Sequence, residues 1–109
     1  MANIAVPKKL SQTELTATLT TLLYTVPAST QGIIKEIMLC NTDSVARTVT
    51  IYAGTGTAVV DTIIDAVSVA SGETQFYTLS TVLDAAEIIS GGASVGSVVS
   101  CTISGVEVS

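Results

Sequence analysis

The chain has no histidine and no tryptophan, and charged residues make up only 12% of its 109 residues. The absence of histidine removes the commonest general base and the commonest metal ligand of proteins. Four basic residues against nine acidic ones give a formal net charge of −5. Because nucleic acids and membrane surfaces are bound through clustered lysine and arginine, this balance argues against both as partners. The composition therefore points away from an enzyme and from a nucleic-acid-binding protein.

Long apolar runs are missing as well. Threonine, serine and aspartate interrupt every apolar stretch before it reaches the roughly 18 residues that a membrane-spanning helix needs. Lys8 and Lys9 follow a short apolar stretch, whereas the basic residues of a secretory signal come first. We therefore expect synthesis in the host cytoplasm. In that compartment Cys40 and Cys101 are expected to be buried free thiols in preference to a disulfide.

β-branched residues, in contrast, are abundant: the chain has 17 threonines, 14 valines and 10 isoleucines. Such residues favour strands. Short turn clusters separate the candidate strands at spacings of roughly 8–12 residues, which is typical of sandwiches and barrels. The sequence predicts an all-β protein with one antiparallel β-sandwich of about seven to nine strands, jelly-roll-like or immunoglobulin-like.

We expect an N-terminal arm over residues 1–10 and a sandwich domain over residues 11–109. The longest apolar run extends from Gln31 to Cys40 and carries apolar side chains on both faces. A strand of this kind is either central and covered on both sides or part of a subunit interface. Farther along, a loop at 54–57 precedes a strand predicted over 59–66. Residues 82–87 are the one stretch that could form a helical turn, and the glycines at 91 and 92 are expected to end the strand that begins at 88.

The sequence predicts no catalytic, cofactor-binding or metal site. Asp61 and Asp65 share one face of a predicted strand, but four residues separate them by roughly 13 Å. Paired carboxylates that act as acid and base need about 5–10 Å. Asp84 and Glu87 could approach each other across a turn, yet the repeated acidic spacing that calcium requires is missing there.

Tyr24, Tyr52 and Tyr77 lie on three different candidate strands. Aromatic rings with a polar tip pack at the edge of a core, and the same rings could stack on a sugar. A glycan-binding surface is therefore an alternative to simple packing.

The order of turns and strands resembles the small virion proteins of tailed bacteriophages. A Tyr-Thr-Val-Pro-Ala turn is followed by an apolar strand that ends in Cys-Asn, and then by a Thr/Val strand. The resemblance spans residues 13–108 and rests on these stretches: 21–30, 34–42, 47–51, 71–74, 82–88 and 103–107. It implies a β-sandwich structural subunit of a phage particle, with no active site.

A surface with little charge suits packing in a symmetric assembly, because interface cores are depleted of charged residues. Our leading hypothesis is a capsid decoration or stabilising protein that acts as a homo-oligomer, a trimer being one order open to it. Its partners would be copies of itself and the major capsid protein or another virion protein. The alternatives are a tail, baseplate or fibre subunit, and a glycan-binding module for host attachment. The expected assembly contacts are Lys8, Lys9, Ile33, Ile34 and Met38.

Overall fold

The computed structural model describes residues 4–109, which form eight β-strands and one short 3-10 turn. The all-β prediction and the expected number of strands are confirmed. The elements in chain order are β1 (Ala5–Glu14), β2 (Leu22–Thr25), β3 (Gln31–Asn41), β4 (Arg47–Gly54), η1 (Val59–Asp61), β5 (Thr62–Val69), β6 (Thr74–Leu83), β7 (Ile88–Ala93) and β8 (Val99–Val108). No helix in the described residues is long and apolar enough to cross a membrane.

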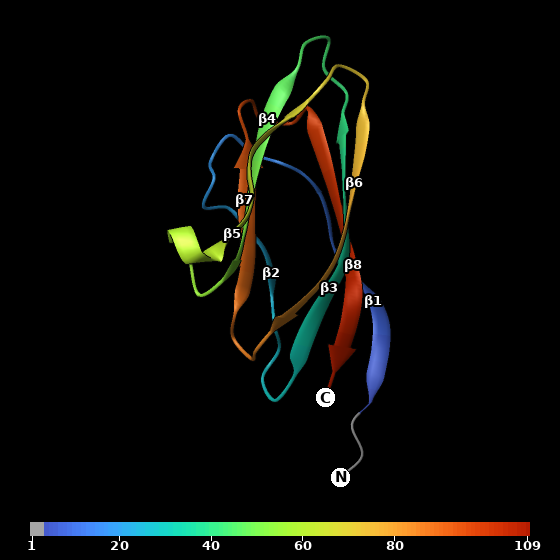
Figure 1. The fold of residues 1–109 in the computed structure, drawn as a ribbon, viewed down its shortest axis with the longest axis vertical. Helices are drawn as coiled ribbons and strands as arrows, with labels where there is room; N and C mark the ends of the chain where they lie inside the picture. Colours follow the sequence, from blue (N-terminus) through green and yellow to red (C-terminus); the bar gives the residue numbers. More distant parts are fainter. Residues whose placement is uncertain (1–3) are drawn as a thin grey trace.

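Two four-stranded sheets pack face to face (Figure 1). Sheet A has the strand order β1-β8-β3-β6, and sheet B has the order β2-β7-β4-β5. All neighbouring strands are antiparallel, and β1 pairs with β8, β2 with β7, β3 with β6 and β4 with β5. The chain is thus a long hairpin rolled up on itself, which is the jelly-roll arrangement. Strand order, which sequence patterns do not reveal, decides between the jelly-roll and immunoglobulin-like alternatives.

The core lies between the two sheets, and both sheets contribute fully buried side chains to it. Ile34, Ile37 and Leu39 of β3 and Ile51 of β4 have no exposed surface. Ile34 and Ile37 are three residues apart, a spacing that would put them on opposite faces of a regular strand. The pairing register shifts between Ile34 and Glu36, and this irregularity turns both isoleucines inward.

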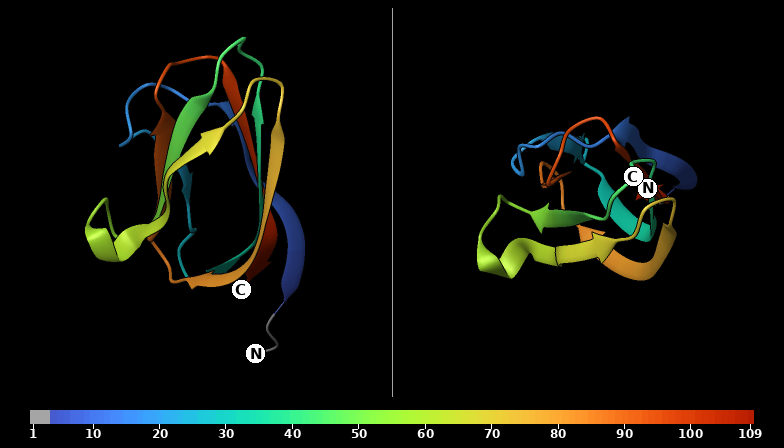
Figure 2. Two further views of the ribbon diagram at one scale, coloured as in Figure 1. Left: turned by 45° about the horizontal axis from the view of Figure 1, so that its top comes forward. Right: turned by 90° about the horizontal axis from the view of Figure 1, so that it is seen from above.

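The apolar residues on both faces of β3 therefore have two different origins. The irregularity in the strand brings Ile34 and Ile37 to the same inner face, while Ile33 and Met38 are half-buried and point outward. No element of residues 4–109 packs over this outer side of sheet A (Figure 2). The sequence left two interpretations of β3, a strand covered on both sides or a subunit interface. Residues 4–109 cover only its inner side.

The expected boundary between arm and domain does not coincide with the end of an element. β1 crosses it, and Ala5 pairs with Val108 while Glu14 pairs with Ser100. Residues 5–10 thus form part of sheet A as an edge strand, and residues 1–3 lie outside the described residues. Residues 5–10 join the sheet because they pair with β8, which lies at the far end of the sequence.

The strand predicted over 59–66 starts later than expected. Val59 to Asp61 form the 3-10 turn η1, and β5 begins only at Thr62. Residues 82–87, the one stretch that could form a helical turn, do not form one, because β6 continues to Leu83 and a tight turn follows. In that turn the carboxylate of Glu87 accepts a hydrogen bond of 2.6 Å from the backbone N–H of Asp84.

The glycines expected to end a strand lie within β7 instead. A Cβ on Gly91 would lie 2.4 Å from the carbonyl oxygen of Thr50, and one on Gly92 would lie 2.6 Å from that of Thr16. Glycine within a strand often marks the close approach of another backbone segment. These two residues allow β4 and the segment after β1 to lie against β7.

Candidate interaction surfaces

No group of three or more His, Cys, Asp or Glu side chains within residues 4–109 could hold a metal ion. The two aspartates weighed as a carboxylate pair do not share a strand face. Asp61 belongs to η1 and is 7% exposed, whereas Asp65 is exposed on β5. The Asp61 carboxylate lies close to Gly54, where a Cβ would approach its oxygen to 2.2 Å. The role of Asp61 is to pack the loop before β5.

One polar cluster joins the two sheets at one end of the sandwich. The hydroxyl of Tyr24 on β2 donates a short hydrogen bond to the carboxylate of Glu107 on β8, and Lys8 Nζ lies 3.1 Å from the same carboxylate. The bond from Tyr24, together with the Lys8 ammonium, lowers the pKa of Glu107. Burial and the neighbouring carboxylate raise the pKa of Tyr24. This cluster ties sheet A to sheet B.

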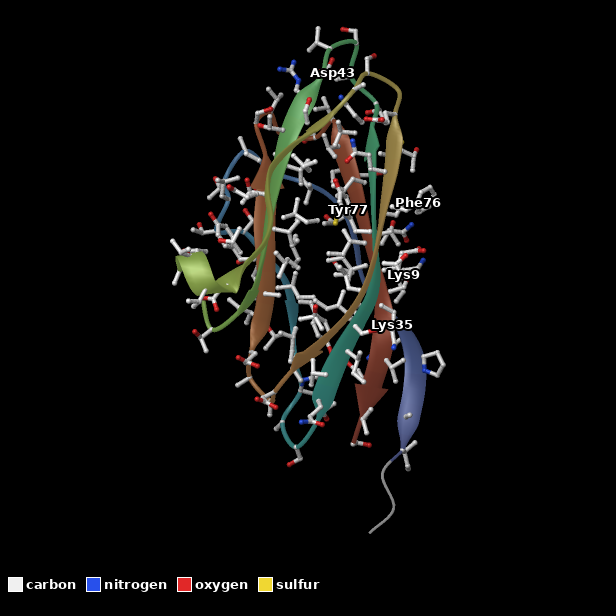
Figure 3. All side chains as sticks on the ribbon, in the orientation of Figure 1. Lys9, Lys35, Asp43, Phe76 and Tyr77 are labelled. Atoms are coloured by element: carbon white, nitrogen blue, oxygen red, sulfur yellow. The ribbon has the colours of Figure 1, made fainter. Side chains whose placement is uncertain are left out.

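The three tyrosines do not form one surface. Tyr24 has its hydroxyl committed to Glu107, and Tyr77 packs between the sheets, where its hydroxyl donates to Gln75 Oε1 at 2.6 Å (Figure 3). Tyr52 is half-buried on β4 of sheet B. A stacking platform built from all three rings is therefore not present in this fold.

Both cysteines are free thiols, as expected. They lie on the neighbouring strands β3 and β8, but Cys40 is half-buried on the outer side of sheet A and Cys101 is fully buried in the core. Burial raises the pKa of the Cys101 thiol to about 12. The two side chains point to opposite faces, which prevents a disulfide between them.

The outward side of sheet A is not covered by another element of residues 4–109, and we call it the outer A face. Its residues share an outward direction on four neighbouring strands: Pro7, Lys9, Gln12 and Glu14 of β1; Ser100, Thr102, Ser104 and Val106 of β8; Ile33, Lys35, Glu36, Met38 and Cys40 of β3; and Thr74, Phe76, Thr78, Ser80 and Val82 of β6.

One row of this face is apolar across the whole sheet. The register places Pro7 beside Val106, Val106 beside Ile33, and Ile33 beside Val82. A second row contains Met38 next to Phe76, the only phenylalanine of the chain. Phe76 is 62% exposed and Val82 is 54% exposed. Figure 3 shows the Phe76 ring pointing away from the sandwich.

The expected assembly contacts divide between this face, its edge and the core. Lys9, Ile33 and Met38 belong to the outer A face. Lys8 pairs with Glu107 on the other side of β1. Ile34 is fully buried between the sheets, so it is a core residue and offers no surface to a partner.

The basic residues are unevenly placed. Arg47 is paired with Asp43, whose Oδ2 lies 2.6 Å from Nη2, and the hydrogen bond from Arg47 lowers the pKa of Asp43. Lys9 and Lys35 make no ion pair within residues 4–109, and both lie on the outer A face. Lys9 donates to Gln12 Oε1 at 2.9 Å, and Lys35 donates to Ser80 Oγ at 3.5 Å.

A second apolar feature projects from sheet B, on the side opposite the outer A face (Figure 1). At the end of the loop between β4 and β5, Val59 is 90% exposed and Val60 is 91% exposed. We call this pair the η1 tip. Sequence patterns missed it because two valines beside alternating residues look like the start of a strand. The only local signal was the preceding Gly54-Thr-Gly56, which makes room for a projecting loop.

One shallow depression of about 290 Å³ opens at the end of the sandwich where the C-terminus lies. Uncharged side chains line it, and none of the three tyrosines takes part. It therefore has neither charge nor an aromatic platform with which to select a ligand.

Neither protein-family models nor curated proteins match the chain. Among solved structures, a chain from the infectious bursal disease virus Gx strain is 15% identical, with a TM-score of 0.51, over 99% of this chain and 33% of that one. A chain from the T13 viral particle of the same virus is 11% identical, with a TM-score of 0.54, over 97% of this chain and 30% of that one. The present chain spans about a third of the length of each. At such identities the likeness establishes a shared fold.

Proposed function

We propose that this protein is a non-enzymatic structural subunit of a virus particle, namely a capsid decoration or stabilising protein of a tailed bacteriophage that acts as a homo-oligomer. Two independent likenesses support this proposal. The stretches at 21–30, 34–42 and 47–51 resemble small virion proteins of tailed phages. The jelly-roll fold is shared with chains from structures of a virus and of its particle.

The observation that carries the proposal is the apolar row across the outer A face. The outer side of an antiparallel sandwich is ordinarily polar, because it faces water. Here Pro7, Val106, Ile33 and Val82 form an unbroken apolar line over all four strands. Exposed apolar surface of this kind marks a site of contact with another protein. A protein with two such surfaces, on opposite sides, is suited to link neighbours in a shell.

We assign the η1 tip to the contact with the shell, because it projects away from the outer A face and leaves sheet A to copies of this chain. Val59 and Val60 are almost fully exposed. Burying a valine side chain contributes roughly 1.5 kcal/mol, so burial of both contributes about 3 kcal/mol. An energy of that size corresponds to roughly a 100-fold change in affinity.

The test is to add the purified protein to phage capsids that lack it. The expected result is saturable, stoichiometric binding and a higher temperature of capsid disruption, measured by sedimentation of the bound fraction and by light scattering. A protein that does not bind capsids would end the decoration hypothesis.

A matched pair of variants locates the contact. Val59→Ser with Val60→Ser is expected to weaken capsid binding roughly 100-fold without changing the melting temperature, since both side chains are already in water. Val45→Ser is the control, because Val45 is 48% exposed in the turn between β3 and β4, away from the tip. Equal affinities of the two variants would move the contact elsewhere on the surface.

The alternative structural role is that of a subunit of the tail, the baseplate or a fibre. Electron microscopy of intact virions carrying a labelled copy of this chain separates the two, because label on the head supports decoration and label confined to the tail refutes it.

A further inference from the structure

The two edges of sheet A differ in how they are protected. An edge strand exposes unpaired backbone N–H and C=O groups, and proteins block its pairing with proline, lysine or a bulge. β1 has all three: Pro7, the adjacent Lys8 and Lys9, and a register shift between Lys9 and Ser11. These features protect the β1 edge against pairing with a strand of another chain.

β6, at the opposite edge, has no such protection. Its ten residues, Thr74–Leu83, include no charged residue, no proline and no glycine. Exposed and partly buried side chains alternate along it without a break, although its pairing with β3 is irregular near Lys35. Figure 2 shows β6 at the margin of the sandwich, and the strand order of sheet A leaves β3 as its one partner in that sheet.

The sequence of β6 is also complementary to itself. When two copies pair antiparallel about a two-fold axis at Leu79, Phe76 of each copy faces Val82 of the other. Thr78 of each copy faces Ser80 of the other in the same register. Aromatic with β-branched residues and threonine with serine are favourable cross-strand pairs. A two-fold axis makes every such pair occur twice.

This register also gives a cross-strand partner to the two exposed apolar side chains of the strand. Phe76 is 62% exposed and Val82 is 54% exposed. Within one chain, Phe76 lies beside Met38 and Val82 lies beside Ile33. Pairing would therefore join the Ile33–Val82 row of each copy to the Phe76–Met38 row of the other, which makes two apolar strips related by the two-fold axis.

We propose that β6 pairs antiparallel with β6 of a second copy of this chain, which joins two sheets A into one eight-stranded sheet. The inference deepens the proposed function, since it rests on the homo-oligomer named there, and it assigns the surface and the symmetry. A two-fold pair replaces the trimer as the basic unit.

The first experiment measures the mass of the full chain by sedimentation equilibrium over a concentration series. The expected mass is twice 11.1 kDa. Thr78→Lys is expected to weaken the dimer about 10-fold or more, because two Thr–Ser pairs are lost and the two lysines become diagonal neighbours of like charge across the axis. Gln12→Lys, at an exposed position on the protected β1, is the control and is expected to leave the dimer intact.

A second experiment keeps the proposal testable if Thr78→Lys does not fold. Thr78→Cys with Ser80→Cys, in a Cys40→Ser background, is expected to form disulfide-linked dimers under mild oxidation. Peptide mapping should find residue 78 joined to residue 80 of the other chain. Gln12→Cys with Glu14→Cys is the matched control on β1 and is expected to remain monomeric on a non-reducing gel.

A monomer at all concentrations, a trimeric mass, or equal cross-linking at β1 and β6 would each overturn the edge pairing. Pairing with a strand of a capsid protein would appear as cross-links to that protein and none between copies, and would overturn it as well. These outcomes are separate from the fate of the proposed function. A monomer that still binds capsids leaves decoration intact, whereas a β6-linked dimer that binds no capsid refutes decoration alone.

Discussion

Replacement of Gly105 by alanine is expected to destabilise the fold more than any other single added methyl group at a glycine of sheet A. Gly105 lies in β8, between β1 and β3, and pairs with Ile34 on one side and Lys8 on the other. A Cβ at this position would lie 2.0 Å from the carbonyl oxygen of Ile33 and 3.0 Å from a methyl carbon of Leu10. The carbonyl belongs to the backbone of the central strand, so it cannot rotate away as a side chain would.

The magnitude follows from two effects. Relief of the clash requires β3 and β8 to separate locally, and the loss of one backbone hydrogen bond costs about 1 kcal/mol. Overpacking at a tight site costs about 1–3 kcal/mol more. A total of about 2–4 kcal/mol lowers the melting temperature of a domain of this size by roughly 8–16 °C. The measurement is thermal unfolding followed by far-UV circular dichroism, with urea unfolding for the free energy.

Gly56→Ala is the matched control. No heavy atom lies within 4 Å of a Cβ at Gly56, in the loop before η1. The added methyl group there restricts the unfolded chain and is expected to change stability by less than about 1 kcal/mol. If Gly105→Ala melts as the wild type does, the close approach of β3 and β8 described above is wrong.

Three further outcomes are expected. Tyr24→Phe should cost about 1 kcal/mol at neutral pH, because the Glu107 carboxylate loses a donor. Because the pKa of Glu107 is lowered, its carboxylate stabilises the fold above pH 4.5, the ordinary pKa of the group, and this stabilisation is lost as the pH falls through the lowered pKa. The difference in free energy of unfolding between variant and wild type, measured by urea titration, should therefore shrink as the pH falls below 4.5. Cys40 should react with a thiol reagent at pH 8 in the native state, whereas Cys101, with a pKa of about 12, should react only after unfolding. Ile34→Ala should cost about 2–5 kcal/mol in urea unfolding, as a core residue does and an interface residue of the free protein would not.

The fold class was predictable because it depends on local patterns. The β-branched composition and the short turns favour strands wherever the chain forms them, and eight strands result. The pairing of those strands was not predictable, since it depends on contacts between distant segments. Ala5 pairs with Val108, and the ion pair of Lys8 joins it to Glu107. No property of residues 5–10 alone reveals that partner.

The candidate surfaces were predictable only in part, for a related reason. Ile33, Ile34 and Met38 all belong to the apolar run of β3, but the irregularity at Lys35 decides which of them face outward. Simple alternation would place Met38 and Ile34 together on one face. The shift by one residue turns Ile34 into the core and leaves Ile33 with Met38 outside. An interface residue and a core residue are therefore indistinguishable until the irregularity is located.

The N-terminal residues illustrate how one motif supports two interpretations. A proline followed by two lysines is typical of a solvated arm, and the same residues are the ones that keep an edge strand from pairing. The partner strand β8 decides between these meanings, because once Ala5–Glu14 lies in sheet A its outer edge needs protection. The composition then has a spatial meaning. Sheet A has two edges, charge and proline are concentrated on one of them, and the edge without either, β6, is the one that also exposes Phe76 and Val82. Proteins protect edge strands because an open edge pairs with other chains, so protection of β1 alone restricts such pairing of sheet A to the edge of β6.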